Sequence, residues 1–413
     1  MNKLILIMID GISAGKFEQM RAQLPHLDAL AKQGCQVKEL TPEICGTSFP
    51  GRTSMIIGRP PAEHGVYGNK IWDGDVFRWS NPYDVRGETL AGFARKAGGD
   101  VINVGYGMVR PEDCNLFIKP WWVNDVMSRG RDNEPHPANE QWSLTNKNLD
   151  PDNRLQRLGM SIDDMVDPIA DREQTLSLGM LADYQLMQVA ATLAGADAPD
   201  LIMLEVGITD YYLHQYGTEH PQTELSLRTA DAQVGALMTQ LRNNGTLDKY
   251  NFAIMSDHGH TSMPDAVRCD LLLPEGCRWS SEGSVLMVAP RSAEEAATVT
   301  EQLLKQGMEV MSKDFIPADL HDTLIAFTCP EGEYVSFEAD VMGTGAIRGA
   351  SKYKSNHGMR PGTPEDNRFC IFAGPNVPQL EVEFATSVQV APTMAAIMGI
   401  ETDWTVESIL QPV

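Results

Sequence analysis

The sequence has little positive charge, few cysteines and no long uninterrupted run of apolar residues. Its 413 residues include 33 Lys and Arg against 56 Asp and Glu, which gives a formal net charge of −23. A chain this acidic repels nucleic-acid backbones and anionic membranes, so we expect no stable binding to duplex nucleic acid or to membranes. Seven scattered Cys, with no Cys-x-x-Cys pair, do not indicate a disulfide framework.

The apolar run near the N-terminus, residues 4–9, is followed at once by Asp and Gly. It is too short for the apolar part of a signal peptide, and no later stretch reaches the length of a transmembrane span. We therefore expect a soluble, cytoplasmic protein, with no indication of its oligomeric state. The 42% hydrophobic content is enough for a large core, with one large domain and a smaller one.

Apolar runs that alternate with amphipathic stretches predict an α/β fold with a largely parallel sheet. Continuous apolar runs are typical of strands buried on both faces. Such runs lie at residues 3–10, 200–206, 251–259 and 369–375. Helical spacing of apolar residues predicts helices over residues 16–34, 175–195 and 224–245.

Two regions differ from this alternation. Residues 108–170 are rich in Asn, Asp, Pro and Trp, which predicts a long irregular excursion. Residues 262–350 contain short strand-like pieces around one helical stretch at 293–307. They predict a small α/β cap inserted into a core made of residues 1–261 and 351–413.

Asp and His residues cluster in four short islands at or after the predicted strands. Ligands of open α/β sheets bind outside the carboxyl ends of the strands, so we expect these side chains to meet. Three Asp and three His suit Zn²⁺ or Mn²⁺, and two such ions can clamp the attacking and leaving oxygens of an in-line displacement. The candidate ligands are Asp10, Asp210, His214, Asp257, His258 and His357.

Each candidate ligand also has a purely structural interpretation. Asp10 could cap a turn after its strand, although a buried charge there is costly unless it is paired or binds metal. Asp210 and His214 share one face of a helical turn and could form an ordinary i,i+4 pair. Asp257 and His258 favour a functional interpretation, because they follow an apolar strand and Gly259 permits the turn that both need to reach one ion. His357 could be an ordinary loop residue.

A hydroxyl nucleophile is available beside these ligands. Ser48 precedes a Pro and an apolar run, which makes it a natural helix N-cap. The same helix N-terminus would offer backbone N–H groups to a phosphate, and a metal ion would activate the hydroxyl. Thr47 is the alternative nucleophile. Asn69 could donate a hydrogen bond to a phosphoryl oxygen, or could occupy a turn beside Gly68.

Other residues could contact an anionic substrate. His260 could do so, or could orient a metal ligand. The basic residues around His357 could also do so, although such runs are usually solvated surface. They are Lys352, Lys354 and Arg360. Trp121 and Trp122 could stack on a base, or could belong to the core.

These motifs resemble the alkaline phosphatase superfamily, and within it the type I phosphodiesterases and nucleotide pyrophosphatases, a branch that includes phosphonoacetate hydrolases. The likeness is carried by IDG at Asp10, SFPGRTSMIIG, HGVYGN, TDYYLHQYG, SDHGH, NHG and VAPTMAAIMGI. The resemblance implies an alkaline phosphatase-like three-layer α/β/α core with a mostly parallel central sheet and a small inserted α/β cap.

The resemblance also implies a role for each position. One divalent ion would be held within reach of Ser48 by Asp10, Asp257 and His258. The other would be held by Asp210, His214 and His357. Asn69 would stabilise the phosphoryl group. Two positions depart from the branch, because Ser48 stands where it usually has Thr and Gly51 where it usually has Asn.

The expected function is hydrolysis of a small phosphate ester, foremost as a phosphodiesterase or nucleotide pyrophosphatase. It would use two Zn²⁺ or Mn²⁺ per chain and a phospho-Ser intermediate at Ser48. The substrate could be a nucleotide, a cyclic dinucleotide, a phosphonate with a C–P bond, or a phosphomonoester. A phosphoryl mutase would use the same site, and a metal-binding protein without activity would not need the nucleophile. Residues 48–52 superficially resemble the Cys/Ser-x-Pro-x-Arg signature of sulfatases, but two full metal triads disfavour that function.

Overall fold

The computed structural model describes residues 1–123, 147–161 and 174–410. Its main sheet has eight strands, which run parallel except for β18, antiparallel to both of its neighbours. The predicted mostly parallel sheet is confirmed. In order across the sheet the strands are β19 (Leu380–Thr386), β2 (Cys35–Thr41), β18 (Arg368–Ala373), β8 (Tyr250–Met255), β1 (Lys3–Ile9), β7 (Leu201–Val206), β5 (Val101–Val104) and β6 (Leu116–Ile118).

The central strand β1 shows why both faces of the sheet are covered. Successive side chains of a strand point to opposite faces. Leu4, Leu6 and Met8 therefore join one hydrophobic cluster, whereas the three Ile side chains that alternate with them join the other. All six are fully buried. A strand buried on both faces needs apolar residues throughout, which is why the sequence reveals it.

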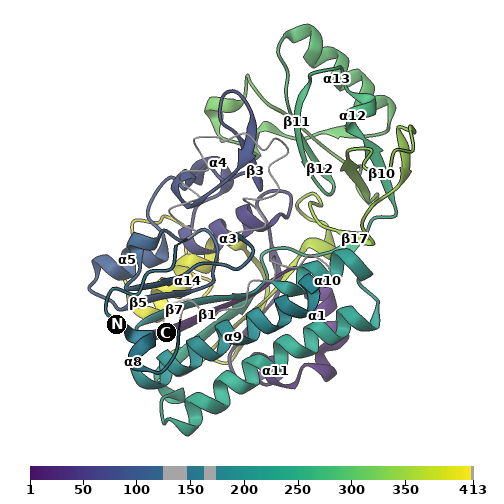
Figure 1. Ribbon diagram of the computed structural model, residues 1–413. Coiled ribbons are helices and arrows are strands. Elements are labelled where there is room, and N and C mark those ends of the chain that lie inside the picture. Colours follow the sequence, from purple (N-terminus) through teal and green to yellow (C-terminus); the bar gives the residue numbers. More distant parts are fainter. Residues whose placement is uncertain (124–146, 162–173, 411–413) are drawn as a thin grey trace.

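Helices form the two outer layers, which confirms the predicted three-layer α/β/α core. Figure 1 shows α9 and α11 side by side along one face of the sheet, with α14 and α5 beyond the other. The first layer contains α1 (Ala14–Met20), α2 (Pro25–Gln33), α9 (Thr175–Ala196), α10 (Ile208–Tyr216) and α11 (Pro221–Asn243). The second contains α3 (Ser48–Ile57), α5 (Leu90–Lys96) and α14 (Val390–Met398).

The single helix predicted over residues 16–34 is wrong in one respect. The structure divides it into α1 and α2, with a 3₁₀ turn at Arg21–Gln23 between them. Pro25 causes the division, because it lacks a backbone N–H and disfavours helical geometry at Leu24, whose φ and ψ are −119° and 63°. The predicted end at Gly34 is confirmed.

Residues 262–350, called here the 262–350 segment, form two small sheets and their own hydrophobic cluster. A second cluster joins this segment to residues 44–72. Its elements are β10 (Asp265–Arg268), α12 (Cys269–Leu272), β11 (Arg278–Glu282), β12 (Val285–Ala289), α13 (Ala293–Lys305), β13 (Glu309–Val310), β14 (Ile325–Thr328), β15 (Val335–Glu338) and β16 (Arg348–Ala350). Its assignment as a cap subdomain, with boundaries at 262 and 350, stays a prediction.

Short elements connect these parts. A ribbon of β9 (Thr261–Ser262) and β17 (Ser355–Asn356) lies where the 262–350 segment leaves and rejoins the core. A hairpin of β3 (Lys70–Trp72) and β4 (Phe77–Trp79) contacts β11. Part of the excursion predicted at 108–170 lies outside the described residues, and the described part contains β6 and α8 (Arg154–Arg157). Among the described helices, none has both the length and the apolar character that crossing a bilayer requires.

Candidate active site

The candidate site lies where three neighbouring parallel strands end. Asp10 directly follows β1, Asp257 lies two residues beyond β8, and Asp210 lies in the first turn of α10 after β7. Because β8, β1 and β7 are adjacent and parallel, their carboxyl ends share one edge of the sheet. The topology therefore brings together acidic groups that are up to 247 residues apart in the chain, as the distance from Asp10 to Asp257 shows.

One predicted ligand trio is assembled as expected. Asp10, Asp257 and His258 are buried, and one donor atom from each lies within 4.8 Å of the others. His258 Nδ1 donates to the carbonyl oxygen of Gly259 at 3.1 Å, because a carbonyl can only accept. Its Nε2 therefore faces Ser48 Oγ at 3.1 Å and Asp10 Oδ1 at 3.3 Å. The predicted nucleophile and the first ligand trio meet at this nitrogen.

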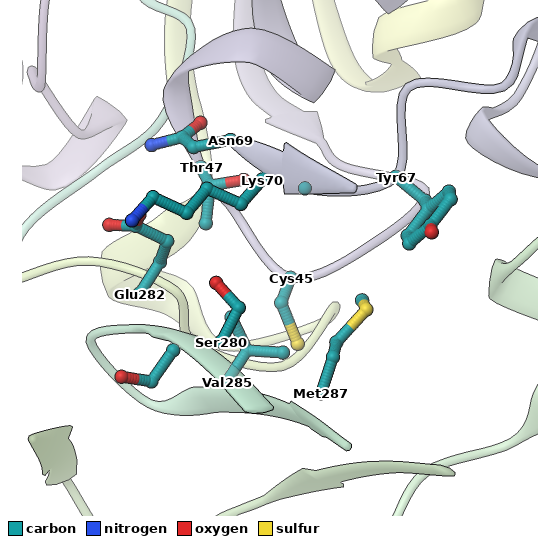
Figure 2. A pocket seen from close by; sticks show the side chains of 11 residues that line it. Cys45, Thr47, Tyr67, Asn69, Lys70, Ser280, Glu282, Val285 and Met287 are labelled. Atoms are coloured by element: carbon teal, nitrogen blue, oxygen red, sulfur yellow. The ribbon is translucent and has the colours of Figure 1, made fainter. Parts of the chain in front are cut away.

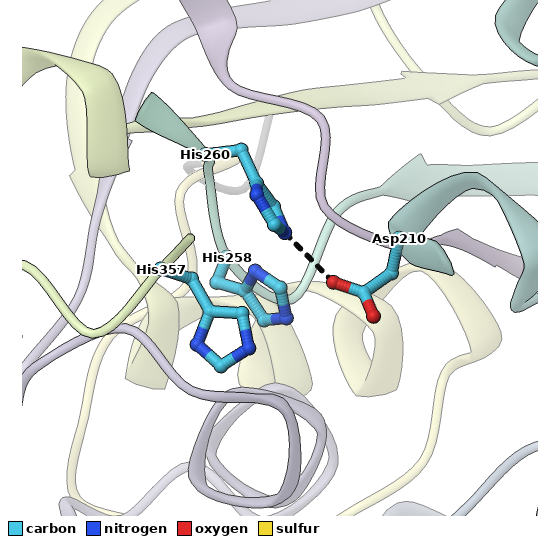
Figure 3. Close-up of side chains that lie close together, drawn as sticks. All are labelled: Asp210, His258, His260 and His357. Atoms are coloured by element: carbon cyan, nitrogen blue, oxygen red, sulfur yellow. Dashed lines mark hydrogen bonds and ion pairs between the residues drawn. The ribbon is translucent and has the colours of Figure 1, made fainter. Parts of the chain in front are cut away.

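The group assembled around Asp210 differs from the second predicted trio. Figure 3 shows Asp210, His258, His260 and His357 gathered together, and their donor atoms lie within 4.8 Å of one another. His260 Nε2 is 2.7 Å from Asp210 Oδ1. His214 lies beside this group, with its Nε2 3.4 Å from the same oxygen. His260 is thus closer to Asp210 than the predicted ligand His214 is.

Ser48 is positioned by the start of α3, and its predicted role as N-cap is wrong. Thr47 occupies the N-cap with extended backbone geometry, and Ser48 is the first helical residue. The Ser48 hydroxyl is therefore directed to His258 instead of back to the helix backbone. Asn69 Oδ1 accepts from the N–H of Phe49 at 2.9 Å, which fixes the carboxamide and leaves its NH₂ group as a donor. Since Pro50 has no N–H, the first turn of α3 offers fewer backbone N–H groups to a phosphate than a helix N-terminus usually does.

Two glycines allow the strand ends to approach other backbone closely. A Cβ at Gly51 would lie 2.1 Å from the carbonyl oxygen of Asp257, so only Gly lets α3 pack against this loop. This accounts for the departure from Asn at that position. Gly259 lacks the positive φ that a turn role would imply. A Cβ there would instead lie 1.9 Å from the carbonyl oxygen of Glu365, so close approach and not a special turn requires glycine.

Arg52 is a buried residue of the site that the sequence motifs did not identify. Its side chain is only 2% exposed. Its guanidinium donates to Asp10 Oδ2, lies 3.2 Å from both carboxylate oxygens of Glu205, and forms an ion pair with Asp257 Oδ2 at 3.0 Å. Trp122 contacts both members of the Arg52–Glu205 pair. Its ring N–H donates to Glu205, and its ring centre lies 5.3 Å from the Arg52 guanidinium carbon.

A sequence signal for this arrangement existed. Arg52 stands four residues after Ser48, so one turn of α3 places both on the same face. Glu205 is a lone carboxylate inside an otherwise apolar strand, and such a group needs a buried cation. Trp121 and Trp122, which could have stacked on a base, both direct their ring N–H groups into the protein. Trp121 Nε1 donates to Asp183 Oδ1 at 2.8 Å, and Trp122 donates to Glu205. Trp122 still lines the cavity described next.

A cavity of about 900 Å³ opens in front of both ligand groups. Core residues form one wall and the 262–350 segment forms the other, through residues such as Glu282, Phe337 and Glu338. A small adjoining cavity of about 20 Å³ lies behind the Ser48 loop. Figure 2 shows Thr47 and Asn69 on one side of it, opposite Ser280 and Val285 of the 262–350 segment.

The predicted substrate-binding residues fall into two groups. Lys352 lines the large cavity, with its Nζ 4.6 Å from the ring centre of Tyr353. Lys354 and Arg360 do not line it, and Arg360 pairs with Glu309 at 2.8 Å. Thr47 lines the small cavity, and its hydroxyl oxygen has no hydrogen-bond partner among the described residues. A role in substrate binding stays a prediction for each of them.

Comparison with known proteins agrees with this geometry. A family profile described as "Type I phosphodiesterase / nucleotide pyrophosphatase" matches residues 4–359. The chain belongs to this family. The relation predicted from the motifs is therefore confirmed, and most of the described site lies within the matched range.

Individual relatives of this family member are distant. The human ectonucleotide pyrophosphatase/phosphodiesterase family member 7 is 23% identical over 266 residues, which cover 63% of this chain and 48% of that protein. A venom phosphodiesterase of Macrovipera lebetinus is 21% identical over 62% of this chain and 25% of its own length. The matched stretch thus spans about half, or less, of these relatives.

Solved structures of family members share the fold. Murine ectonucleotide pyrophosphatase/phosphodiesterase 5, an inactive form in complex with AMP, superposes with a TM-score of 0.71 at 14% identity. The match covers 99% of this chain and 97% of that one. The human counterpart gives a TM-score of 0.69 at 16% identity over 98% of this chain. The alkaline phosphatase-like fold expected from the motifs is therefore confirmed.

The donor set fits the divalent ions that this family implies. One potential metal-ligand atom supports this fit. His357 Nδ1 is buried and has no hydrogen-bond partner among the described residues. Burial, together with the charge of Asp257, raises the pKa of Asp10 well above its usual value in spite of Arg52. Asp10 thus lies where a neighbouring cation is favoured.

Replacing Arg52 by Met should destabilise the metal-free protein by about 3–5 kcal/mol, because three buried carboxylates would lose their cation. Urea unfolding after chelation measures this free energy. Arg59→Met is a matched control, since Arg59 is half-exposed and lies 3.5 Å from an exposed Asp403. The control should cost less than about 1 kcal/mol. An equally small cost at Arg52 would contradict its role.

Metal binding to the first trio should release a proton. Burial opposes the charged form of His258, but Asp257 and Asp10 outweigh it and raise the pKa of His258 to about 10. The ring therefore carries a proton at pH 8 that an ion must displace, so the apparent affinity should rise with pH by up to about tenfold per unit. Titration calorimetry with Zn²⁺ in two buffers of different ionisation enthalpy counts the proton. The absence of proton release at pH 8 would contradict this assignment.

Proposed function

We propose that this chain hydrolyses a phosphodiester or diphosphate bond in a small nucleotide-type substrate, with Ser48 as the nucleophile and two divalent ions as cofactors. The observation that carries the proposal is the position of Ser48. Its hydroxyl lies 3.1 Å from His258 Nε2, at the junction of the ligand groups and in the wall of the large cavity. Family membership supports the reaction class.

The ions, which the Asp10 and Asp210 ligand groups would hold, would supply Lewis-acid chemistry for the displacement. Ser48 Oγ attacks phosphorus from the N-terminus of α3. The bond from phosphorus to the leaving oxygen breaks, a proton equivalent to the one lost from the hydroxyl ends on the leaving group, and a phospho-Ser48 intermediate forms that still carries the other ester group. Water then cleaves the bond from phosphorus to Ser48 Oγ, releases the phosphate monoester and restores the hydroxyl.

Asn69 is suited to hold the phosphoryl group during both steps. Its carbonyl oxygen is engaged by the N–H of Phe49, so the NH₂ group remains as the donor, and Asn69 lines the cavity. A fixed donor of this kind costs no reorganisation when charge develops on a phosphoryl oxygen. The positive end of α3 adds to the same effect.

A nucleotide fits the lining of the cavity better than a plain phosphate does. Aromatic side chains of Phe49, Trp79 and Tyr211 line it, and the Phe49 ring lies 5.8 Å from that of Trp79. Aromatic faces bind bases by stacking, and Lys70 and Lys352 in the same lining suit anionic groups. The related mouse protein is described in complex with AMP. The cytoplasmic location expected from the sequence stays a prediction.

The first test compares ester classes after metal removal and reloading with Zn²⁺ or Mn²⁺. We expect bis(p-nitrophenyl) phosphate to be cleaved faster than p-nitrophenyl phosphate, because the cavity accommodates two ester groups. The p-nitrophenyl ester of thymidine 5′-phosphate should be faster still, owing to base stacking. A preference for the monoester, or no cleavage of any of the three, would contradict the proposal and redirect the search to phosphatase, mutase or phosphonate chemistry.

Ser48→Ala should lower kcat by at least about 10³-fold while leaving the metal content unchanged, because the variant loses only the attacking oxygen. Metal analysis and turnover of the diester measure both quantities. Thr47→Ala is the matched control and should retain most of the activity. Full activity of Ser48→Ala, combined with loss in Thr47→Ala, would transfer the role to Thr47.

A further inference from the structure

Ser355 contacts two histidines of the site at once. Its backbone carbonyl oxygen accepts from His214 Nδ1 at 3.0 Å. Its hydroxyl oxygen lies 3.1 Å from His260 Nδ1, and the hydroxyl itself donates to the carbonyl of Leu213 at 2.6 Å. Both rings are therefore oriented from the same residue, on β17 where the 262–350 segment rejoins the core.

These contacts fix where each ring carries its proton. A neutral imidazole has one N–H and one lone pair. His214 must carry its proton on Nδ1, because the Ser355 carbonyl can only accept. His260 must do the same, because the hydrogen of the Ser355 hydroxyl is already donated to Leu213. The Nε2 atom of each ring is then left with a lone pair.

Both lone pairs face one carboxylate oxygen. His260 Nε2 is 2.7 Å from Asp210 Oδ1, and His214 Nε2 is 3.4 Å from it. Three electron-rich atoms with no hydrogen among them repel one another unless a cation lies between them.

We infer that His260 is a further protein ligand of the ion bound by Asp210, beside the ligands His214 and His357 that the family resemblance implies. The inference rests on the proposed two-ion site and adds a residue to it. Donor atoms of Asp210, His258, His260 and His357 lie within 4.8 Å of one another, and this group includes His260 but not His214.

The added imidazole determines which metal the site prefers. Three imidazoles and one carboxylate form a nitrogen-rich set, whereas Mn²⁺ favours oxygen donors. This chain should therefore select Zn²⁺ over Mn²⁺ at the Asp210 site more strongly than at the Asp10 site, which offers two carboxylates and one imidazole.

The test compares His260→Ala with wild type by metal binding, without reference to turnover. Chelated protein is titrated with Zn²⁺, with Mn²⁺ and with Co²⁺, and the affinity of each ion and the visible absorption of bound Co²⁺ are recorded. We expect His260→Ala to bind one Zn²⁺ as wild type does, to bind the other at least about tenfold more weakly, and to lose its Zn²⁺ preference there. The Co²⁺ spectrum should change in the same variant.

Three further variants make the result specific. His260→Gln keeps most of the side-chain volume and should show the same loss, which covers the case in which His260→Ala does not fold. Ser355→Ala removes the hydroxyl that orients His260 but keeps the carbonyl that orients His214, so it should weaken the same ion less. His26→Ala removes an exposed histidine and should change nothing.

Unchanged Zn²⁺ affinity and an unchanged Co²⁺ spectrum in His260→Ala and His260→Gln would overturn the inference and leave His260 as a partner of Asp210 only. This failure is separate from failure of the proposed function. If substitution of His260 weakens one ion but the wild-type protein cleaves no phosphate ester, His260 is a ligand and the proposed activity is wrong. If substitution of His260 leaves both ions unchanged and the wild-type protein is an active diesterase, the proposed activity stands and His260 is not a ligand.

Discussion

The ion pairs of one buried guanidinium hold together the edge of the sheet that carries the candidate site. Arg52 contacts carboxylates that follow β1 and β8 and one that lies within β7, the three central parallel strands. Without a cation, three acidic groups at such close range in the protein interior would repel one another and lose their hydration. Arg52 neutralises part of this charge, and the ligand geometry around it depends on that compensation.

The same residue links Ser48 to the acidic groups of the site. Arg52 and Ser48 lie on one face of α3, so the ion pairs that anchor the guanidinium also fix the start of the helix. Gly51 permits the contact, because any side chain there would meet the backbone of Asp257. The position of the Ser48 hydroxyl therefore follows from the packing of α3 against the end of β8.

Backbone carbonyls orient the imidazoles in a common way. His258 is held through Nδ1 by Gly259, and His214 through Nδ1 by Ser355. Each ring then presents Nε2 to a carboxylate, which is the arrangement that prepares a histidine to bind a metal ion. The cavity in front of these groups is completed by the 262–350 segment, so its lining combines core residues beside the ligands with residues of a segment that holds none of them.

The sequence by itself determined the class of fold and identified most of the Asp and His residues that the structure gathers at one edge of the sheet. Strands such as β1 must be apolar on both faces, and the Asp and His islands follow them directly, so the pattern is local and readable. It did not reveal Arg52 as the partner of Asp10, the place of His260 beside Asp210, or the true N-cap of α3. Nor did it show that Pro25 divides a helix, although that signal was local. The polar contacts of Arg52 span 42 positions to Asp10 and 205 to Asp257, and those of His260 span 50 to Asp210 and 95 to Ser355. Such contacts depend on which strand ends become neighbours, and only the tertiary packing of the sheet decides that.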